Sequence, residues 1–394
     1  MIYVHVPFCR SFCTYCGFYS ETAPGCRKEE DALRQEEKFE RFAQALEAEI
    51  RTRKDDIQRV FTSAGVSTLY IGGGTPSVLP LPIIGRIVDA LRSVGHPCEF
   101  EEFTVEVNPE DIIEKGEDYV RGLAALGVNR ISMGVQSFDD GILKWMNRRH
   151  SAAQAVEAYH ILETSGISNI SIDLIFGLPQ MSEDLWRDTI SKALNISSGG
   201  IPPRHISAYQ LSVEEDSMLE KLIAKGRWSE ASEQLCERQY GILCEELAAA
   251  GYNHYEISNF AQPGSEAVHN SAYWRHVPYI GLGPGAHSFM DHVSMRQWNE
   301  PDLNAYLEAG VSGNFSVVQG GERLDQDQLT MEKIMLGLRT AAGVPSDYLR
   351  DHCDVHALEQ ALASSNLVPL EDGNIRIPED RFFVSDNIIL TLIA

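Results

Sequence analysis

The sequence predicts an α/β protein in which a parallel sheet, covered by helices, curls into a full or partial barrel. Two observations predict this fold. Six apolar, strand-like runs alternate with five helix-like segments between residues 2 and 211, and a glycine or polar cluster follows most of the runs. Strands that alternate with helices are typical of parallel βα units, and right-handed crossovers curl such a sheet into a barrel. In that architecture the reactive residues belong at the carboxyl ends of the strands.

The six runs are rich in Val, Ile and Phe, as a sheet covered by helices requires. We expect strands over residues 2–6, 68–71, 103–107, 130–135, 170–176 and 205–211. Apolar residues at helical spacing predict helices over residues 39–50, 83–91, 119–126 and 152–164, and a further helix after an N-cap at Ser182. Residues 20–38 are rich in charge and are expected to form a solvated loop or the frayed start of a helix.

The rhythm changes after residue 211. A long amphipathic helix is expected over residues 234–250, a linker over 300–325, a helix over 331–339, and a small helix-plus-hairpin unit after residue 348. We therefore divide the chain into a barrel core (1–215), an associated extension (216–320) and a C-terminal domain (321–394).

Charge and hydropathy exclude some functions. The net charge of −24 argues against a nucleic-acid partner, which would require a basic face. No apolar run reaches the roughly 18 residues of a membrane span. No secretory signal is recognised, so a cytoplasmic protein is expected, with a mitochondrion or plastid as the alternative if a transit peptide was removed.

Three closely spaced cysteines, Cys9, Cys13 and Cys16, follow the first strand directly. Structural zinc and a closed [4Fe–4S] cluster each need four ligands, so three thiolates indicate a cluster with one iron open to another ligand. The alternative is a structural zinc loop completed by His5 or Cys26. The remaining cysteines show no metal-like spacing and are expected to be free thiols.

The spacing C-x3-C-x2-C after a first strand resembles that of radical S-adenosylmethionine (SAM) proteins, in which the open iron binds the methionine end of SAM. The run Gly72-Gly73-Gly74-Thr75-Pro76 resembles the glycine motif of the same superfamily. Nearly the whole chain is similar to the oxygen-independent coproporphyrinogen III oxidase (HemN) group. The runs that carry this similarity are YVHVPFC (3–9), GGGTP (72–76), EVNP (106–109), GVQSF (134–138), NR (147–148) and DLIFGLP (173–179).

The resemblance implies a partial (β/α)6 radical-SAM barrel with a small C-terminal α+β domain of the HemN type. It also implies two sets of SAM contacts. Tyr3, Gly73 and Glu106 match contacts to the SAM on the cluster. A second set matches positions that hold another SAM in the oxidases: Tyr15, Gly74, Thr75, Gln136, Arg148 and Asp173.

Two departures from the oxidases favour another branch. Phe18 stands where the oxidases have a further cysteine, and their N-terminal extension is not seen here. The run HNSAYW (269–274) matches the H-N-x-x-Y-W motif of the HemW branch, which is described as haem chaperones. In this interpretation His269 is an axial iron ligand, and Tyr273 and Trp274 offer aromatic faces to the macrocycle. The alternative is a hydrogen-bonded histidine in an aromatic core patch, and His287 is a weaker candidate ligand.

The resulting expectation is a haem chaperone that uses a [4Fe–4S] cluster, SAM and haem. Its partners would be haem-acceptor proteins such as haem enzymes and respiratory cytochromes, with a homodimer left open. The rival is an enzyme, oxygen-independent coproporphyrinogen III oxidase. A third hypothesis is a radical-SAM enzyme that acts on an unrelated substrate.

Overall fold

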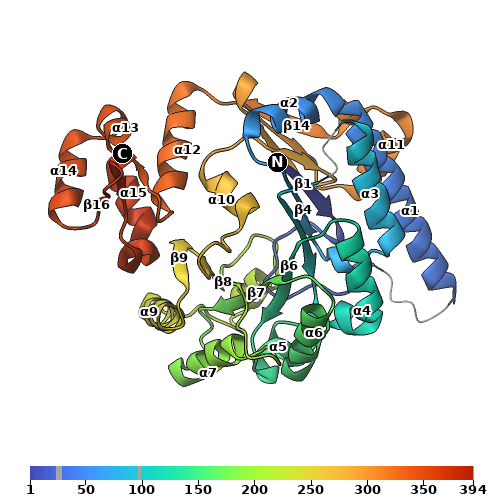
Figure 1. Cartoon of the computed structure of the whole chain (residues 1–394), viewed down its shortest axis with the longest axis horizontal. Helices are drawn as coiled ribbons and strands as arrows, with labels where there is room; N and C mark the ends of the chain where they lie inside the picture. Colours follow the sequence, from blue (N-terminus) through green and yellow to red (C-terminus); the bar gives the residue numbers. More distant parts are fainter. Residues whose placement is uncertain (24–28, 96–98, 394) are drawn as a thin grey trace.

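The central sheet of the protein is built around the six predicted parallel strands (Figure 1). The structure is a computed structural model that describes residues 1–23, 29–95 and 99–393. Within these residues the strand order is β11-β1-β4-β5-β6-β7-β8-β10-β9, so the sheet is an open, partial barrel. The parallel pairing from β1 to β8 confirms the predicted fold class. The six strands are β1 (Ile2–Val6), β4 (Thr68–Gly73), β5 (Glu102–Val107), β6 (Arg130–Gln136), β7 (Asn169–Phe176) and β8 (His205–Gln210).

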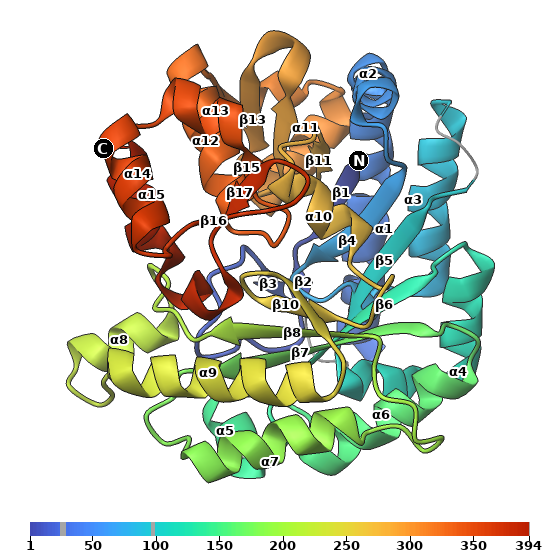
Figure 2. The same ribbon diagram turned by 60° about the vertical axis from the view of Figure 1, so that its left-hand side comes forward.

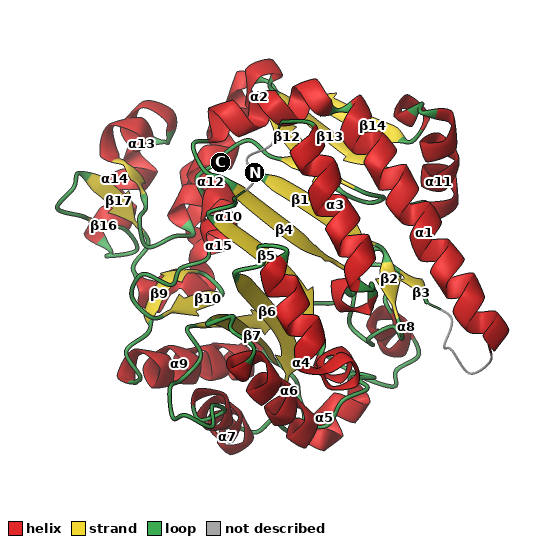
Figure 3. Cartoon of the chain, turned by 45° about the vertical axis from the view of Figure 1, so that its right-hand side comes forward, coloured by secondary structure: helices red, strands yellow, loops and turns green. Residues whose placement is uncertain are grey.

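Helices, whose bounds are given at the end of this paragraph, cover the outer face of this sheet (Figure 3). Apolar side chains at helical spacing, such as Ile84, Ile87 and Leu91, are buried against the strands. The predicted N-cap Ser182 accepts a hydrogen bond from the Leu185 amide, which explains why the helix after it begins there. The outer helices are α1 (Glu29–Thr52), α3 (Leu81–Ser93), α4 (Pro109–Ala125), α6 (Ala152–Thr164), α7 (Glu183–Leu194) and α9 (Glu233–Ala249).

Segments from residues 216–320 complete both edges of the sheet. Strand β11 (Ile280–Leu282) pairs in parallel with β1, while β10 (Asn259–Ala261) and β9 (Asn253–Glu256) extend the opposite edge in antiparallel fashion. Helix α10 (Val268–Trp274) connects the two edges. Three further strands, β12 (His287–Met290), β13 (Met295–Asn299) and β14 (Gln319–Arg323), form a separate antiparallel sheet.

The C-terminal elements lie together at one side of the molecule (Figures 1 and 2, red). A small sheet of β15 (Val344–Pro345), β17 (Asn374–Arg376) and β16 (Val368–Pro369) packs with four helices. These are α12 (Gln326–Leu338), α13 (Ser346–His352), α14 (Val355–Ala363) and α15 (Ser385–Ile393). A single hydrophobic cluster extends from the barrel into this segment and includes Leu349 and Ile375. The domain boundaries at 215 and 320 stay a prediction.

Two expectations from the sequence need correction, and for the charged segment the structure agrees with the start of a helix. Residues 300–325 are not a linker, because they form α11 (Leu303–Ser312), which packs on α1, and strand β14, which pairs with β13. Helix α4 begins at Pro109, ten residues before its predicted start, and Gly116 interrupts it with φ 68°. The charged segment becomes helical at Glu29, after the short strand β3 (Glu21–Thr22), while residues 24–28, with Cys26, lie outside the described residues.

Some short elements had no clear signal in the sequence. They are β2 (Phe8–Cys9), α2 (Lys54–Ala64), α5 (Asp140–Trp145), α8 (Met218–Ala224) and the 3₁₀ turns η1 (Pro76–Val78), η2 (Asp291–Val293), η3 (Phe315–Val317) and η4 (Glu379–Val384). None of the helices in the described ranges is long and apolar enough to cross a membrane.

Glu256 at the end of β9 gives a pH-dependent prediction. The residue is completely buried, its Oε1 atom has no hydrogen-bond partner, and burial raises its pKa from 4.5 to about 7. Between these two pKa values the unfolded chain loses this proton and the folded chain keeps it. The free energy of unfolding contributed by Glu256 therefore falls as pH rises through this window and is constant above it.

Replacing Glu256 with Gln removes this titration. Because only the wild type loses stability as pH rises, we expect the free energy of unfolding of the variant minus that of the wild type to increase. The increase should be on the order of 2–3 kcal/mol between about pH 4.5 and about pH 7. Urea unfolding of both proteins at each end of this window measures the difference. A stability difference that does not change with pH would contradict the prediction.

Candidate functional site

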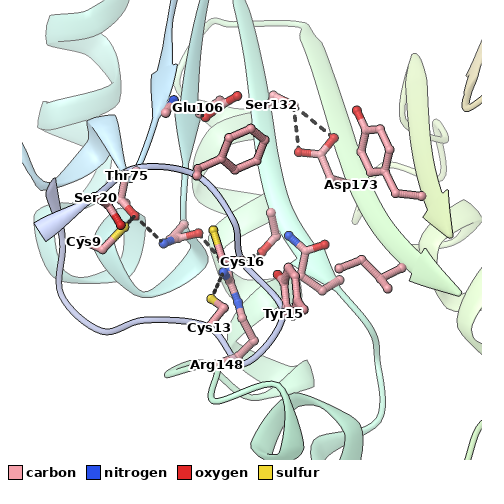
Figure 4. Close-up of a pocket in the computed structure, with 18 of the residues that line it drawn as sticks. Cys9, Cys13, Tyr15, Cys16, Ser20, Thr75, Glu106, Ser132, Arg148 and Asp173 are labelled. Carbon is pink, nitrogen blue, oxygen red and sulfur yellow. Dashed lines mark hydrogen bonds between the residues drawn. The ribbon is translucent and has the colours of Figure 1, made fainter. Parts of the chain in front are cut away.

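The three-cysteine loop forms one wall of a large cavity at the carboxyl ends of the strands. Cys9 lies in β2, directly after β1, and Cys13 and Cys16 follow on the loop; all three line a cavity of about 590 Å³ (Figure 4). The backbone of Thr14 holds the loop in place, since its amide donates to the Met146 carbonyl at 3.1 Å and its carbonyl accepts from the Leu219 amide at 2.9 Å. The loop is therefore anchored to the two segments that flank the cavity.

A half-buried cation lies beside the thiols. Arg148 Nη1 lies 3.5 Å from Cys13 Sγ, and its Nη2 donates at 2.6 Å to both Asn108 Oδ1 and the Gly134 carbonyl (Figure 4). Burial raises the pKa of Cys9, and it raises the pKa of Cys16 to about 11. Thiols of this kind become thiolates only when a metal replaces the proton, and a positive charge beside them stabilises the thiolate form.

The glycine run at the end of β4 lets the backbone approach the cysteine loop. The Gly74 amide donates to the Val6 carbonyl at 2.8 Å. A Cβ atom on Gly74 would lie 2.7 Å from the Phe8 carbonyl oxygen and 3.0 Å from Cys9 Sγ. The neighbouring Gly73 has φ 107°, a conformation that favours glycine. The local sequence is thus matched to a close contact between two loops.

Glu106 is the acidic group closest to this glycine run. Its carboxylate accepts from Tyr70 Oη at 2.7 Å and from the Gly73 amide at 3.1 Å. Burial, followed by the nearby charge of Asp173, raises the pKa of Glu106 to about 7, although the Tyr70 and Gly73 hydrogen bonds oppose the rise. A carboxyl group in this environment can accept hydrogen bonds from an ammonium or hydroxyl group of a ligand.

The far side of the same cavity carries a second polar group. Asp173 accepts from Ser132 Oγ at 2.9 Å, and burial raises its pKa (Figure 4). Gln136, at the end of β6, has φ 69° and lines the cavity as well. Burial also raises the pKa of Tyr15, on the cysteine loop, so its hydroxyl stays protonated.

The cavity brings together all but one of the SAM and cluster residues named from the sequence. It is lined by Cys9, Cys13, Tyr15, Cys16, Gly73, Gly74, Thr75, Glu106, Gln136, Arg148 and Asp173. Tyr3 instead lines a neighbouring cavity. Its hydroxyl group is hydrogen-bonded to His5 Nδ1, with 3.0 Å between the two atoms. His5 Nε2 contacts the Tyr19 carbonyl at 2.8 Å, so neither nitrogen of His5 is free to serve as a fourth metal ligand.

Several lining residues were not identified from the sequence. Asn108 bridges Arg148 and Thr75, and Tyr70 holds Glu106. Further examples are Arg130, Ser132, Ser207, Tyr209 and Asn270. The period of two along β4, β6 and β8 could have identified Tyr70, Ser132, Ser207 and Tyr209, because alternate residues of a barrel strand face the interior. Asn270 is different, since it lies on α10, outside the parallel strands.

A second cavity of about 390 Å³ adjoins the first. We call it the aromatic cavity, and its lining is Tyr3, His5, Gly17, Phe18, Tyr19, Tyr70, His269, Asn270, Tyr273, Tyr279, Gly285 and His287. The two cavities share Gly17, Phe18, Tyr70 and Asn270. The side chain of Phe18, directly after the cysteine loop, is 71% exposed.

The HNSAYW motif lies on α10, and three of its residues, His269, Asn270 and Tyr273, line this second cavity. His269 is 1% exposed, and its ring nitrogens lie 2.7 Å from Thr68 Oγ1 and 3.0 Å from Tyr273 Oη. Burial lowers the pKa of His269 to about 3, so the ring is neutral. Trp274 is half-buried and is not among the lining residues of either cavity. Iron coordination by His269 would require its hydrogen bond to Tyr273 to break.

Gly74→Ala tests the close contact between the glycine run and the cysteine loop. The added methyl group would overlap the Phe8 carbonyl oxygen, which belongs to the backbone and cannot move aside cheaply. We expect the iron and sulfide content after anaerobic reconstitution to fall at least severalfold. Gly85→Ala is the matched control, because Gly85 lies within α3 and its nearest neighbour, Leu126 Cδ2, is 3.5 Å from the added Cβ. Equal iron content in both variants would contradict the importance of this contact.

Comparisons with known proteins identify the family. The model of the radical SAM superfamily matches residues 3–193. The chain is 32% identical over 342 residues to "Heme chaperone HemW" of Lactococcus lactis, which covers 87% of this chain and 82% of the relative. It is 31% identical over 348 residues to the protein of the same name from Bacillus subtilis, with 87% and 84% covered.

A solved structure confirms the architecture. The coproporphyrinogen III oxidase HemN of Escherichia coli, described as a radical SAM enzyme, superposes with a TM-score of 0.74 at 23% identity, covering 100% of this chain and 89% of that chain. At this identity the likeness shows the fold. The superfamily implies a [4Fe–4S] cluster and SAM. The three thiols, with the adjacent cation, fit the cluster, and the glycine run beside them fits SAM. The chain belongs to the HemW family of the radical SAM superfamily.

Proposed function

We propose that this protein is a haem chaperone that binds haem in the aromatic cavity and delivers it to acceptor proteins. The observation that carries the proposal is the cavity itself, whose walls consist mainly of tyrosine, phenylalanine and histidine side chains. Aromatic faces bind a flat macrocycle, and histidines are common ligands of haem iron. The names of the bacterial relatives support the same function.

We further propose that Cys9, Cys13 and Cys16 hold the cluster and that SAM occupies the adjoining cavity. When bound, the cluster would offer an open iron to the amino and carboxylate groups of SAM and would be a source of one electron. The Gly73 backbone and Glu106 would orient the ammonium group, since the carboxylate already accepts two hydrogen bonds there. Arg148 would offset the negative charge of the thiolates.

Within the aromatic cavity, His269 and Tyr273 form one wall and Phe18 forms part of another. The hydrogen bond between His269 and Tyr273 fixes their orientation, so this wall is preorganised. Trp274 would contribute to the stability of α10 rather than to direct haem contact. The six cysteines described as free thiols fit the expected reducing compartment, and we propose a cytoplasmic location on this basis.

Phe18→Ala tests where the haem binds, with Phe12→Ala as the matched control. Both side chains are exposed and belong to the same loop, but Phe18 lines both cavities whereas Phe12 lines only the first. Loss of one aromatic contact removes about 1 kcal/mol, so we expect haem affinity to fall roughly fivefold in Phe18→Ala. Absorbance titration with haemin measures both affinities. Equal weakening in the two variants would contradict haem binding in the aromatic cavity.

Delivery is tested by mixing the haem-loaded protein with increasing amounts of an apo-form of a b-type haem protein. Direct transfer predicts that the observed rate rises with acceptor concentration, because the acceptor takes part in the slow step. A rate that is independent of acceptor concentration would indicate passive release and would contradict a delivery function towards that acceptor.

A further inference from the structure

We propose that His287 is the residue of this chain that coordinates haem iron in the aromatic cavity. The inference deepens the proposed function and depends on it. Three histidines line the cavity, His5, His269 and His287, and they differ in what their ring nitrogens already contact.

Two of the three are fully engaged. His5 is 4% exposed and contacts the Tyr3 hydroxyl and the Tyr19 carbonyl. His269 is 1% exposed and contacts Thr68 and Tyr273. Coordination by either ring would leave a buried polar group without a partner, and such a loss costs about 1–3 kcal/mol.

Within the described part of the chain, His287 is neither buried nor hydrogen-bonded through its ring. Its side chain is exposed at the cavity, and no hydrogen bond to either ring nitrogen is found among the residues that the structure describes. Partial burial and then the charge of Arg296 lower its pKa, which favours the neutral imidazole that binds iron. It is the histidine of the cavity with a nitrogen available at no cost in hydrogen bonds.

The position of His287 is nevertheless well defined. It is the first residue of β12 and lies directly opposite Trp298 of β13, on which its ring stacks at 6.0 Å and 27°. The indole is fixed in turn, because its Nε1 donates to Glu300 Oε1 at 2.9 Å. The His287 backbone packs so tightly against β11 that a Cβ on Gly281 would lie 2.0 Å from the His287 carbonyl oxygen. The rigid backbone and the stacked indole therefore fix where the available nitrogen can be presented to a ligand in the cavity.

The test is a haemin titration of the cluster-reconstituted wild type, His287→Ala, His269→Ala and His292→Ala. His292 is the matched control, because it is an exposed histidine five residues further along that does not line the cavity. We expect His287→Ala to lose the absorption and electron paramagnetic resonance signature of histidine-ligated haem and to bind haem at least about tenfold more weakly. Added imidazole should restore the signature, and His292→Ala should match the wild type.

A second variant separates coordination from folding. His287→Met should show the spectrum of a methionine-ligated haem, which a misfolded protein would not produce. A wild-type spectrum in both His287 variants, with loss of ligation only in His269→Ala, would overturn the inference and leave the haem-carrier function intact. A wild type that binds no haem would overturn both.

Discussion

Cys13→Ser is expected to abolish the iron–sulfur cluster. A serine hydroxyl remains protonated where a cysteine becomes a thiolate, so one of the three proposed ligands is lost and an open cluster has no spare protein ligand. The position is also the one closest to a cation, since Arg148 Nη1 lies 3.5 Å from the sulfur. We expect iron and acid-labile sulfide to fall to near background after anaerobic reconstitution, together with the visible absorption of the cluster.

Cys353→Ser is the control for this experiment. Cys353 is a free, buried thiol that belongs to the C-terminal segment and lines neither cavity. Its replacement should leave the iron content unchanged. Wild-type iron in Cys13→Ser, or equal loss in both variants, would contradict the assignment of the three-cysteine loop as the cluster site.

Glu49→Ala is expected to produce the largest loss of stability. Glu49 is completely buried in α1, and its carboxylate accepts from Asn299 Nδ2 at 2.8 Å, the Gly283 amide at 2.9 Å and Tyr306 Oη at 2.7 Å. Its charge is balanced by Arg53, one turn away, whose guanidinium donates to the Gly281 carbonyl at 2.8 Å. Removal of the carboxylate takes away the counter-charge of a buried cation and an acceptor that three donors share.

The expected cost is about 3–5 kcal/mol, because breaking a buried ion pair leaves an uncompensated charge. Urea unfolding measures it, with Glu117→Ala as the control. Glu117 forms an exposed pair with Arg121, one turn away, and such pairs contribute about 1 kcal/mol or less. A loss of similar size in both variants would show that the Glu49 network is not a structural centre.

This network also connects the core to the aromatic cavity. It joins α1 to β11 and to β13, the strand that carries Trp298, and Arg53 Nη2 donates to Ser288 Oγ at 3.1 Å, next to His287. A Glu49 variant that still folds should therefore bind haem less tightly, because the wall that positions His287 would be less rigid.

The sequence predicts the parallel strands well because their signal is local. Buried runs such as residues 103–107 and 170–176 need only their own side chains to indicate a covered strand. The three-cysteine loop and the glycine run are local patterns too, and the structure brings both to one cavity. Residues 300–325 gave no such signal, since β14 contains two glycines and is defined by its backbone pairing with β13.

The partners of the histidines could not be predicted from the sequence. The hydrogen bond between His269 and Thr68 joins residues 201 positions apart, and it forms only because α10 packs against β4. The availability of His287 likewise depends on the sheet of β12, β13 and β14, which the sequence did not predict. The motif pointed to α10, whose His269 lines the aromatic cavity, but a motif cannot distinguish an imidazole that is already hydrogen-bonded from one that is available.

The most direct test of the account compares two activities on one anaerobic, cluster-reconstituted preparation. The protein is incubated with SAM, a reductant and coproporphyrinogen III, and a second portion is titrated with haemin. A haem chaperone of this kind is expected to bind one haem per chain, with a histidine-ligated spectrum, and to form no protoporphyrinogen IX above the enzyme-free control. Formation of protoporphyrinogen IX without stoichiometric haem binding would contradict this function and would identify the protein as a porphyrinogen oxidase.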